Sequence, residues 1–205
     1  GGVILAMKGV HPDEELAGLP AVRDVPVLET QDPNSAETRR FLQEVEPDMV
    51  VAACKTILRR EIFDVPAHGT FVVHPGICPE YRNAHGCFWA LARRDLERVG
   101  ATLLRIDEGV DTGPVYGYYS TSFDERRESH VVIQLRSVYD NFDRISEDLR
   151  RVYEGSAVPI DENLDIARSH AMQAPRVNAQ QQRAIAVEPR DLTDQRGPID
   201  RRARG

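Results

Sequence analysis

The sequence contains no long apolar run. The longest apolar stretches, Val3–Met7 and Met49–Cys54, have the length of a β-strand, whereas a helix that crosses a bilayer needs about 20 apolar residues. The first stretch follows Gly1-Gly2 without a basic region before it and is too short for a secretory signal. We therefore expect no membrane partner.

Cysteine and lysine are also scarce. The three cysteines, Cys54, Cys78 and Cys87, form no C-x-x-C pair, and an odd number at this spacing does not suggest a disulfide framework. We expect a reducing, cytoplasmic location. Lys8 and Lys55 are the only lysines, and the net charge is −7 with neutral histidines. Because a sequence-independent nucleic-acid binder needs a basic surface, the charge argues against nucleic acid as a partner.

Composition separates the 205-residue chain into two parts. Hydrophobic residues make up 41% and charged residues 29% of it, as in globular proteins. We predict an α/β domain over residues 1–158 and a polar tail of low order over 159–205. The tail contains three consecutive glutamines and few large apolar residues, which do not bury enough surface to offset its ordering entropy.

Strand-like and helical patterns alternate along the first part. This alternation predicts a Rossmann-like, mainly parallel sheet flanked by helices. The strands are expected at Val3–Met7, Val25–Leu28, Asp48–Cys54, Thr70–His74, Ala101–Ile106 and Val115–Tyr119, and the Asp48–Cys54 strand has the continuous apolar pattern of one covered on both faces. Helices are expected after a capping box at Asn34–Glu37, at Arg59–Phe63 and at Ala84–Arg98.

A longer helix is expected after Ser129. Seven apolar residues recur at alternating spacings of four and three: Val131, Leu135, Val138, Phe142, Ile145, Leu149 and Val152. One stripe of this kind predicts a single C-terminal helix of about 22 residues, ended by Gly155 and packed on the sheet. A coiled-coil homodimer is the alternative.

Polar residues follow several of the predicted strands. His74 ends one strand and runs into Pro75-Gly76, while Asp107 and Asp111 lie in the loop after a later strand. Ligands bind at the carboxyl ends of strands in open α/β sheets. A carboxylate beside a histidine fixes its tautomer or its charged form, and a charged histidine can stabilise an oxyanion or move a proton in acyl transfer. A purely structural strand-end histidine is the alternative.

These residues belong to a longer pattern. His74-Pro75-Gly76-x-x-Pro79-x-Tyr81-Arg82, then Gly100-Ala101-Thr102, then Asp107-x-Gly109-x-Asp111-Thr112-Gly113-Pro114, resembles the formyltransferase catalytic-domain family. The run from Asp48 to Leu58 resembles the family's strand and folate-holding loop. The resemblance covers residues 3–120, and it implies a formyltransferase fold and transfer of a formyl group from 10-formyltetrahydrofolate to a small-molecule amine.

The resemblance also implies roles for individual residues. His74 is the catalytic histidine that polarises the formyl carbonyl, and Asp111 is the catalytic aspartate that keeps His74 charged and helps relay the proton of the amine. The pterin pocket is lined, largely through backbone groups, by Lys55, Thr56, Ile57, Leu58, Ile106, Asp107, Glu108, Gly109 and Val110.

The sequence departs from the family pattern at two points. Val72 stands where the family has an asparagine whose amide helps hold the oxyanion, and the loss of one such donor typically costs about 10²–10³ in rate. Asn83 and His85 are the nearest substitutes in sequence, with ordinary loop polarity as the alternative. We also expect the chain to enter the family fold at its second strand. A chain without the first strand would expose sheet edges and lack part of the substrate site, so the N-terminal side does not define the substrate.

Two other functions remain open from the sequence alone. The first is a catalytically impaired member that acts as a ligand-binding or protein-interaction domain. The second is a formyltetrahydrofolate hydrolase that transfers to water. A metal hydrolase on His74, His85 and Asp111 is disfavoured because these residues form no compact metal-binding element, so no metal is expected.

Overall fold

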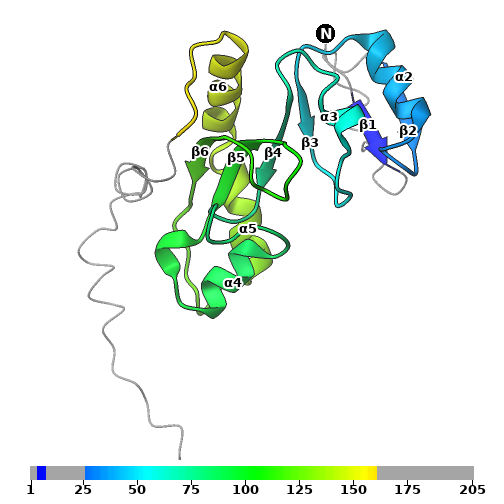
Figure 1. The fold of residues 1–205 in the computed structure, drawn as a ribbon. Coiled ribbons are helices and arrows are strands. Elements are labelled where there is room, and N and C mark those ends of the chain that lie inside the picture. The colour runs from blue at the N-terminus through cyan, green and yellow to red at the C-terminus, as the bar shows by residue number, and fades with distance from the viewer. Residues whose placement is uncertain (1–3, 8–25, 161–205) are drawn as a thin grey trace, which may run out of the picture. The chain divides into compact units, whose positions relative to one another are not determined.

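The computed structural model describes residues 4–7 and 26–160, which form two sheets (Figure 1). In the first sheet, β1 (Ile4–Met7) pairs in parallel with β2 (Val27–Thr30). The second sheet has the order β3-β4-β5-β6, with bounds Val50–Ala52, Thr70–His74, Ala101–Arg105 and Val115–Tyr119. The predicted tail lies outside the described residues from position 161 onward.

The α/β class is confirmed, but the four-stranded sheet is mixed where a mainly parallel sheet was expected. Strand β3 is parallel to β4, whereas β4–β5 and β5–β6 are antiparallel. The connection at residues 106–114 explains the last pairing, because a parallel pair needs a crossover of a dozen or more residues. In the β4–β5 register, Phe71 lies opposite Arg105 and His74 opposite Thr102. The carboxyl end of β5 therefore lies at the opposite end of the sheet from His74.

The predicted cap of the first helix is one residue early. Helix α2 (Ala36–Val45) is capped by Ser35, whose side chain accepts a hydrogen bond from the Thr38 N–H at 3.1 Å. Asn34 instead bonds a distant loop: its amide donates to Ile57 O at 3.0 Å and accepts from Arg59 N at 2.7 Å.

Helix α3 (Arg60–Phe63) lies where a short helix was predicted. The helix predicted over 84–98 is shorter: α4 spans Gly86–Ala92, and a separate 3₁₀ turn spans Leu96–Arg98. Arg94, with a φ of 58°, lies between them in the left-handed region and ends the α-helical path.

The prediction of one long helix after Ser129 is wrong. The structure has α5 (His130–Tyr139) and α6 (Phe142–Tyr153), and the buried Asn141 separates them. The Asn141 amide donates to Ser120 O at 2.9 Å and to Ser137 O at 3.1 Å. These bonds tie the break between the two helices to the end of β6.

The predicted apolar stripe is buried only in part as a result. On α6, Ile145 and Val152 are buried, as expected. On α5, the buried residues are Ile133 and Ser137, whereas Val131 is 51% exposed. The stripe is therefore not one continuous packing face, and a homodimer stays a prediction.

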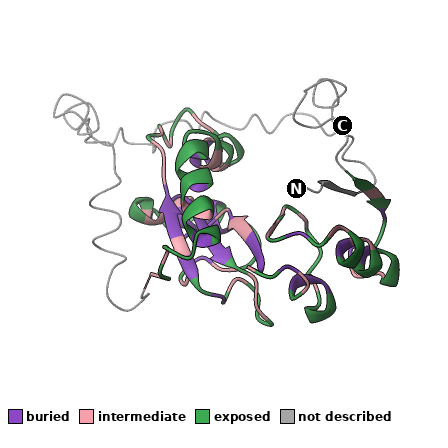
Figure 2. Cartoon of the chain, turned by 90° about the horizontal axis from the view of Figure 1, so that it is seen from above, coloured by how far each residue is buried: buried purple, intermediate pink, exposed green. Residues whose placement is uncertain are grey.

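The core of the described residues lies on β4, β5 and β6. Phe71, Leu103 and Tyr119 pack against Ile145 and Val152 of α6. A separate cluster, around Cys87, Ala90 and Ile133, joins α4 to α5. Figure 2 shows buried residues concentrated on β4, β5 and β6 and exposed residues on the outer helix faces.

Strand β3 lies at the edge of its sheet and is shorter than predicted. Val51 is 52% exposed, so the prediction of a strand covered on both faces is wrong. At the other edge, the Ile160 N–H donates to Val115 O at 2.7 Å and ties the chain after α6 to β6. None of the helices in the described ranges is long and apolar enough to cross a membrane.

Candidate active site

His74 ends β4 with its imidazole almost completely buried. Nδ1 lies 3.3 Å from Oδ2 of Asp111, and Nε2 lies 2.8 Å from the carbonyl oxygen of Tyr81. Both ring nitrogens thus face acceptor oxygens. A neutral imidazole has one N–H and satisfies one of these acceptors, whereas the imidazolium donates to both.

Asp111 reaches His74 because the 106–114 loop folds back from the far end of β5. Asp111 has a φ of 53°, in the left-handed region that non-glycine residues seldom adopt. Two neighbours hold it there: the Asn83 N–H donates to Oδ2 at 2.9 Å, and Arg82 Nε donates to the Asp111 carbonyl at 2.8 Å. The predicted meeting of His74 and Asp111 is found, although it does not arise from parallel strand ends.

Two glycines let the Tyr81 carbonyl approach His74. A Cβ added to Gly76 would collide with the Tyr81 carbonyl oxygen and lie 2.8 Å from His74 Nε2. A Cβ added to Gly86 would lie 2.6 Å from the same carbonyl oxygen. Sequence reasoning missed the contacts of Tyr81 and Arg82 because main-chain atoms make part of each. The signal available in the sequence was the pair of glycines, Gly76 and Gly86, on either side of the loop that contains Tyr81.

An ion pair joins the second predicted folate loop to the start of α3, which follows the first loop. Arg60 Nη1 lies 3.1 Å from Glu108 Oε1, although both side chains are largely exposed. Asp107 Oδ1 accepts from Gly109 N at 2.9 Å and from the Thr112 hydroxyl at 2.7 Å, which stabilises the second loop internally.

The apolar side chains of these loops lie on the surface. Ile57 is 67% exposed and Val110 is 41% exposed, while Lys55 and Thr56 are exposed and Leu58 and Ile106 are partly buried. The loops thus present Ile57, Val110 and backbone groups at the surface.

The auxiliary candidates make no side-chain contact with the pair. Asn83 and His85 are both exposed, with φ values of 68° and 66°. Asn83 reaches Asp111 only through its backbone N–H, and His85 precedes α4 without a side-chain capping bond. Val72 packs against an apolar cluster that includes Ile77. Position 72 therefore contributes no polar donor.

Across residues 4–7 and 26–160, no group of three or more His, Cys, Asp or Glu side chains is arranged to hold a metal ion. The metal-hydrolase interpretation, which needs His74, His85 and Asp111 together, has no ligand set in that part of the chain.

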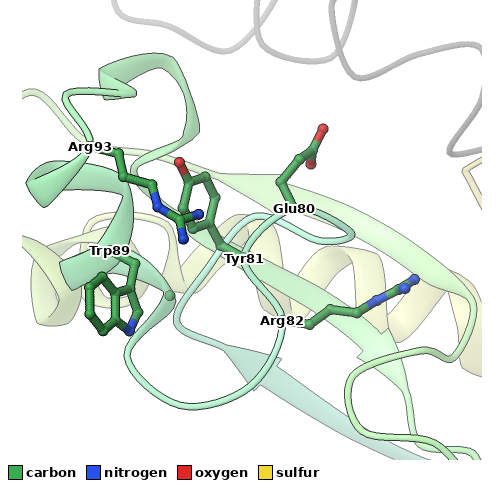
Figure 3. Close-up of a pocket in the computed structure, with 6 residues that line it drawn as sticks. Glu80, Tyr81, Arg82, Trp89 and Arg93 are labelled. Atoms are coloured by element: carbon green, nitrogen blue, oxygen red, sulfur yellow. The ribbon is translucent and has the colours of Figure 1, made fainter.

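A hollow lies beside Tyr81. It is lined by Glu80, Tyr81, Arg82, Gly86, Trp89 and Arg93. Figure 3 shows the Arg93 guanidinium beside the Tyr81 ring, with Trp89 on the same side and Arg82 directed the other way. Tyr81 and Gly86 therefore face both the hollow and the surroundings of His74.

Solved structures with this fold come from several formyl-group enzymes. A phosphoribosylglycinamide formyltransferase from Anaplasma phagocytophilum is 15% identical with a TM-score of 0.56, and the match covers 68% of this chain and 72% of that one. A formyltetrahydrofolate deformylase from Pseudomonas syringae pv. tomato is 23% identical with a TM-score of 0.57, and the match covers 72% and 54%. At these identities the likeness shows the fold.

Sequence relatives include methionyl-tRNA formyltransferases. The one from Sorangium cellulosum is 30% identical over 150 residues, which are 72% of this chain and 47% of the relative. The one from Myxococcus xanthus is 40% identical over 108 residues, 51% of this chain and 32% of the relative. The chain thus spans half or less of the length of these relatives. The Formyl transferase family matches residues 15–134, more than half of the chain, and the protein therefore belongs to that family.

Proposed function

We propose that the protein transfers a formyl group from 10-formyltetrahydrofolate to an amine, with His74 and Asp111 at the reacting centre. The observation that carries this proposal is the 3.3 Å contact between the two side chains. Family membership supports formyl transfer. A structural neighbour that is a formyltransferase in complex with tetrahydrofolate supports a folate donor.

The residues of the site have complementary roles in this reaction. The amine nitrogen bonds to the formyl carbon, the bond from that carbon to N10 of the folate breaks, and the proton lost by the amine ends on N10. Negative charge develops on the formyl oxygen, where the His74 imidazolium stabilises it. Asp111 keeps His74 charged and relays the proton. Direct donation to the oxyanion requires the Nε2–H to be shared between the Tyr81 carbonyl and the formyl oxygen.

The folate is assigned to the loops 55–58 and 106–110. Their exposed apolar residues Ile57 and Val110 provide contact area for the pterin, and their backbone groups provide hydrogen bonds. Arg60, at the start of α3 just after the first loop, pairs with Glu108 of the second loop at an exposed position. Asn34 fixes the first loop through the Ile57 carbonyl.

The acceptor in this proposal is a small-molecule amine. The sequence relatives are named for methionyl-tRNA, but the net charge of −7 lacks the basic excess that nucleic-acid binding uses. Residues 1–158 form the catalytic domain in this proposal, and 159–205 are an appended polar segment. A cytoplasmic location remains a prediction.

A steady-state assay separates this function from its alternatives. The full chain is incubated with 10-formyltetrahydrofolate and a panel of amines, and tetrahydrofolate and formate are measured. Release of tetrahydrofolate that depends on the amine supports the transferase. Equal release without amine, together with formate, identifies a hydrolase. Binding of 10-formyltetrahydrofolate without release of tetrahydrofolate or formate identifies a catalytically impaired member. Val72, in place of the family's asparagine, is the reason to test this alternative.

A further inference from the structure

The segment from Tyr81 to Asn83 contacts both members of the proposed reacting pair. The Tyr81 carbonyl oxygen lies 2.8 Å from His74 Nε2, and because a carbonyl oxygen only accepts, the proton of this contact lies on Nε2. On the other side of the pair, Arg82 Nε donates to the Asp111 carbonyl at 2.8 Å and the Asn83 N–H donates to its carboxylate at 2.9 Å. The placement of the two reacting side chains therefore depends on where this segment lies.

The side chain of Tyr81 anchors the segment to the turn after α4. The tyrosine is 5% exposed, and its hydroxyl donates to Asp95 Oδ2 at 2.9 Å. Asp95 is itself held, since its N–H donates to the Ala90 carbonyl at 2.9 Å and Arg98 Nη1 donates to its Oδ2 at 3.2 Å. Arg98 Nε also lies 3.2 Å from Oε1 of Glu80. Two consecutive residues of the loop, Glu80 and Tyr81, are thus tied to one turn.

We propose that Asp95 is a positioning residue for formyl transfer, which holds the Tyr81 carbonyl on His74 by binding the Tyr81 hydroxyl. A tyrosine ring is rigid, so a bond at its hydroxyl restrains the main chain at its other end. Displacement of a reacting group by about 1 Å can cost about 10² in rate. In the described part of the chain, none of the bonds of Asp95 goes to His74 or Asp111, so its effect on them passes through Tyr81. The words formyl transfer rest on the proposed function; the anchoring of His74 does not.

Tyr119 provides a matched comparison, because its surroundings repeat those of Tyr81. It is 1% exposed, its hydroxyl donates to Asp148 Oδ2 at 2.8 Å, and the Arg144 guanidinium lies 5.4 Å from its ring centroid. The Arg93 guanidinium interacts with the Tyr81 hydroxyl and lies 5.8 Å from that ring centroid (Figure 3). Tyr119, however, packs in the core against α6. Loss of either hydroxyl removes the same kind of bond, and only that of Tyr81 is linked to the reacting centre.

Steady-state kinetics of the full chain tests the proposal. Tyr81→Phe and Asp95→Ala should each lower kcat at least about tenfold, while KM for 10-formyltetrahydrofolate changes less than about threefold because the folate loops are unaltered. Asp95→Asn keeps an oxygen that accepts from the Tyr81 hydroxyl, so its kcat should stay within about threefold of the unaltered chain. Tyr119→Phe should also stay within about threefold, although it loses a bond of the same kind.

A second measurement needs no activity. In the full chain with isotope-labelled histidine and without folate, the His74 Nε2–H signal is assigned in an NMR spectrum by its absence from His74→Asn. This proton should be protected from exchange with water, and Tyr81→Phe or Asp95→Ala should speed its exchange at least about tenfold. Asp95→Asn and Tyr119→Phe should leave the exchange rate unchanged.

Three results would overturn the proposal: no protected signal in the unaltered chain, unchanged exchange in Tyr81→Phe and Asp95→Ala chains that circular dichroism shows to be folded, or an equal loss of kcat in Tyr119→Phe and Tyr81→Phe. Faster exchange in Tyr81→Phe together with no formyl transfer by the unaltered chain would contradict the proposed function and leave the anchoring of His74 standing.

Discussion

His74 Nδ1 lies 3.3 Å from Asp111 Oδ2, although Asp111 belongs to a loop that leaves the sheet at the end away from His74. The two side chains are only 7% and 16% exposed. Their electrostatic interaction is therefore less screened than that of a surface pair. The left-handed backbone of Asp111 and its hydrogen bonds to Arg82 and Asn83 hold the Asp111 side chain in the position that contacts His74.

If His74 and Asp111 act as a unit, the losses in kcat caused by substituting each residue should not add in the double variant. His74→Asn and Asp111→Asn should each reduce kcat by about 10²-fold or more, and the double variant should be little worse than either, as in other catalytic groups that work together. Steady-state kinetics of the three variants gives the comparison. The exposed Asp143→Asn on α6 is the control and should keep full activity. Additive losses in the double variant would show two independent residues.

The side chain of Val72 tests whether the oxyanion site lacks a donor. Val72→Asn should increase kcat by about 10-fold or more, because one preorganised donor is worth about 10²–10³ in rate and the substitution also disturbs an apolar contact. Val72→Ala, which adds no donor, should give no increase. Unchanged kcat in a folded Val72→Asn variant would show that another group already stabilises the oxyanion.

Local sequence patterns predicted the strands more reliably than the long helix. The strands predicted at 70–74, 101–106 and 115–119 correspond to β4, β5 and β6, because each is a short buried segment between turn residues. The break at Asn141 depends on a bond to Ser120, which lies 21 residues away in sequence. The sequence pattern within the helix contains no sign of a hydrogen-bond partner so far away in the chain.

The difference between local patterns and contacts made only by the folded chain also applies to the candidate site. His74, Asp107 and Asp111 could be selected because their side chains carry the chemistry and end or follow strands. The choice of Asp111 over Asp107 came from the resemblance to the family. The Tyr81 carbonyl and the Asn83 N–H could not be selected, since every residue has these main-chain groups and only the folded loop directs them. The antiparallel direction of β5 was also missed, so the reason given for the meeting of the loops was incomplete.

The Asn141 bonds should matter for stability. Asn141→Ala should lower the free energy of unfolding by about 1–3 kcal/mol, because it leaves the Ser120 carbonyl without its amide donor. Ser146→Ala, at an exposed position on α6, should change it by less than about 0.5 kcal/mol. Urea unfolding followed by circular dichroism measures both. Equal stability of the two variants would contradict a structural role for the break.

Cys87 should make stability fall at alkaline pH. Burial raises the pKa of the Cys87 thiol from 9.0 to about 11, so the folded state favours the neutral thiol. This contribution is fully present below pH 9 and is lost as the pH rises from about 9 to about 11. The fall in Tm over that window should therefore be smaller in Cys87→Ala than in the unaltered chain. Parallel curves for the two proteins would rule out this linkage.

Binding of the formyl donor is the most direct test of the proposed chemistry. The full chain is titrated in a calorimeter with a 10-formyltetrahydrofolate analogue whose formyl group cannot transfer. The account predicts micromolar binding that Ile57→Asp and Val110→Asp each weaken at least about tenfold, or about 1.4 kcal/mol, while Val131→Asp on the exposed face of α5 leaves it unchanged. No binding by a folded chain, or equal weakening by Val131→Asp, would contradict a folate site on these loops.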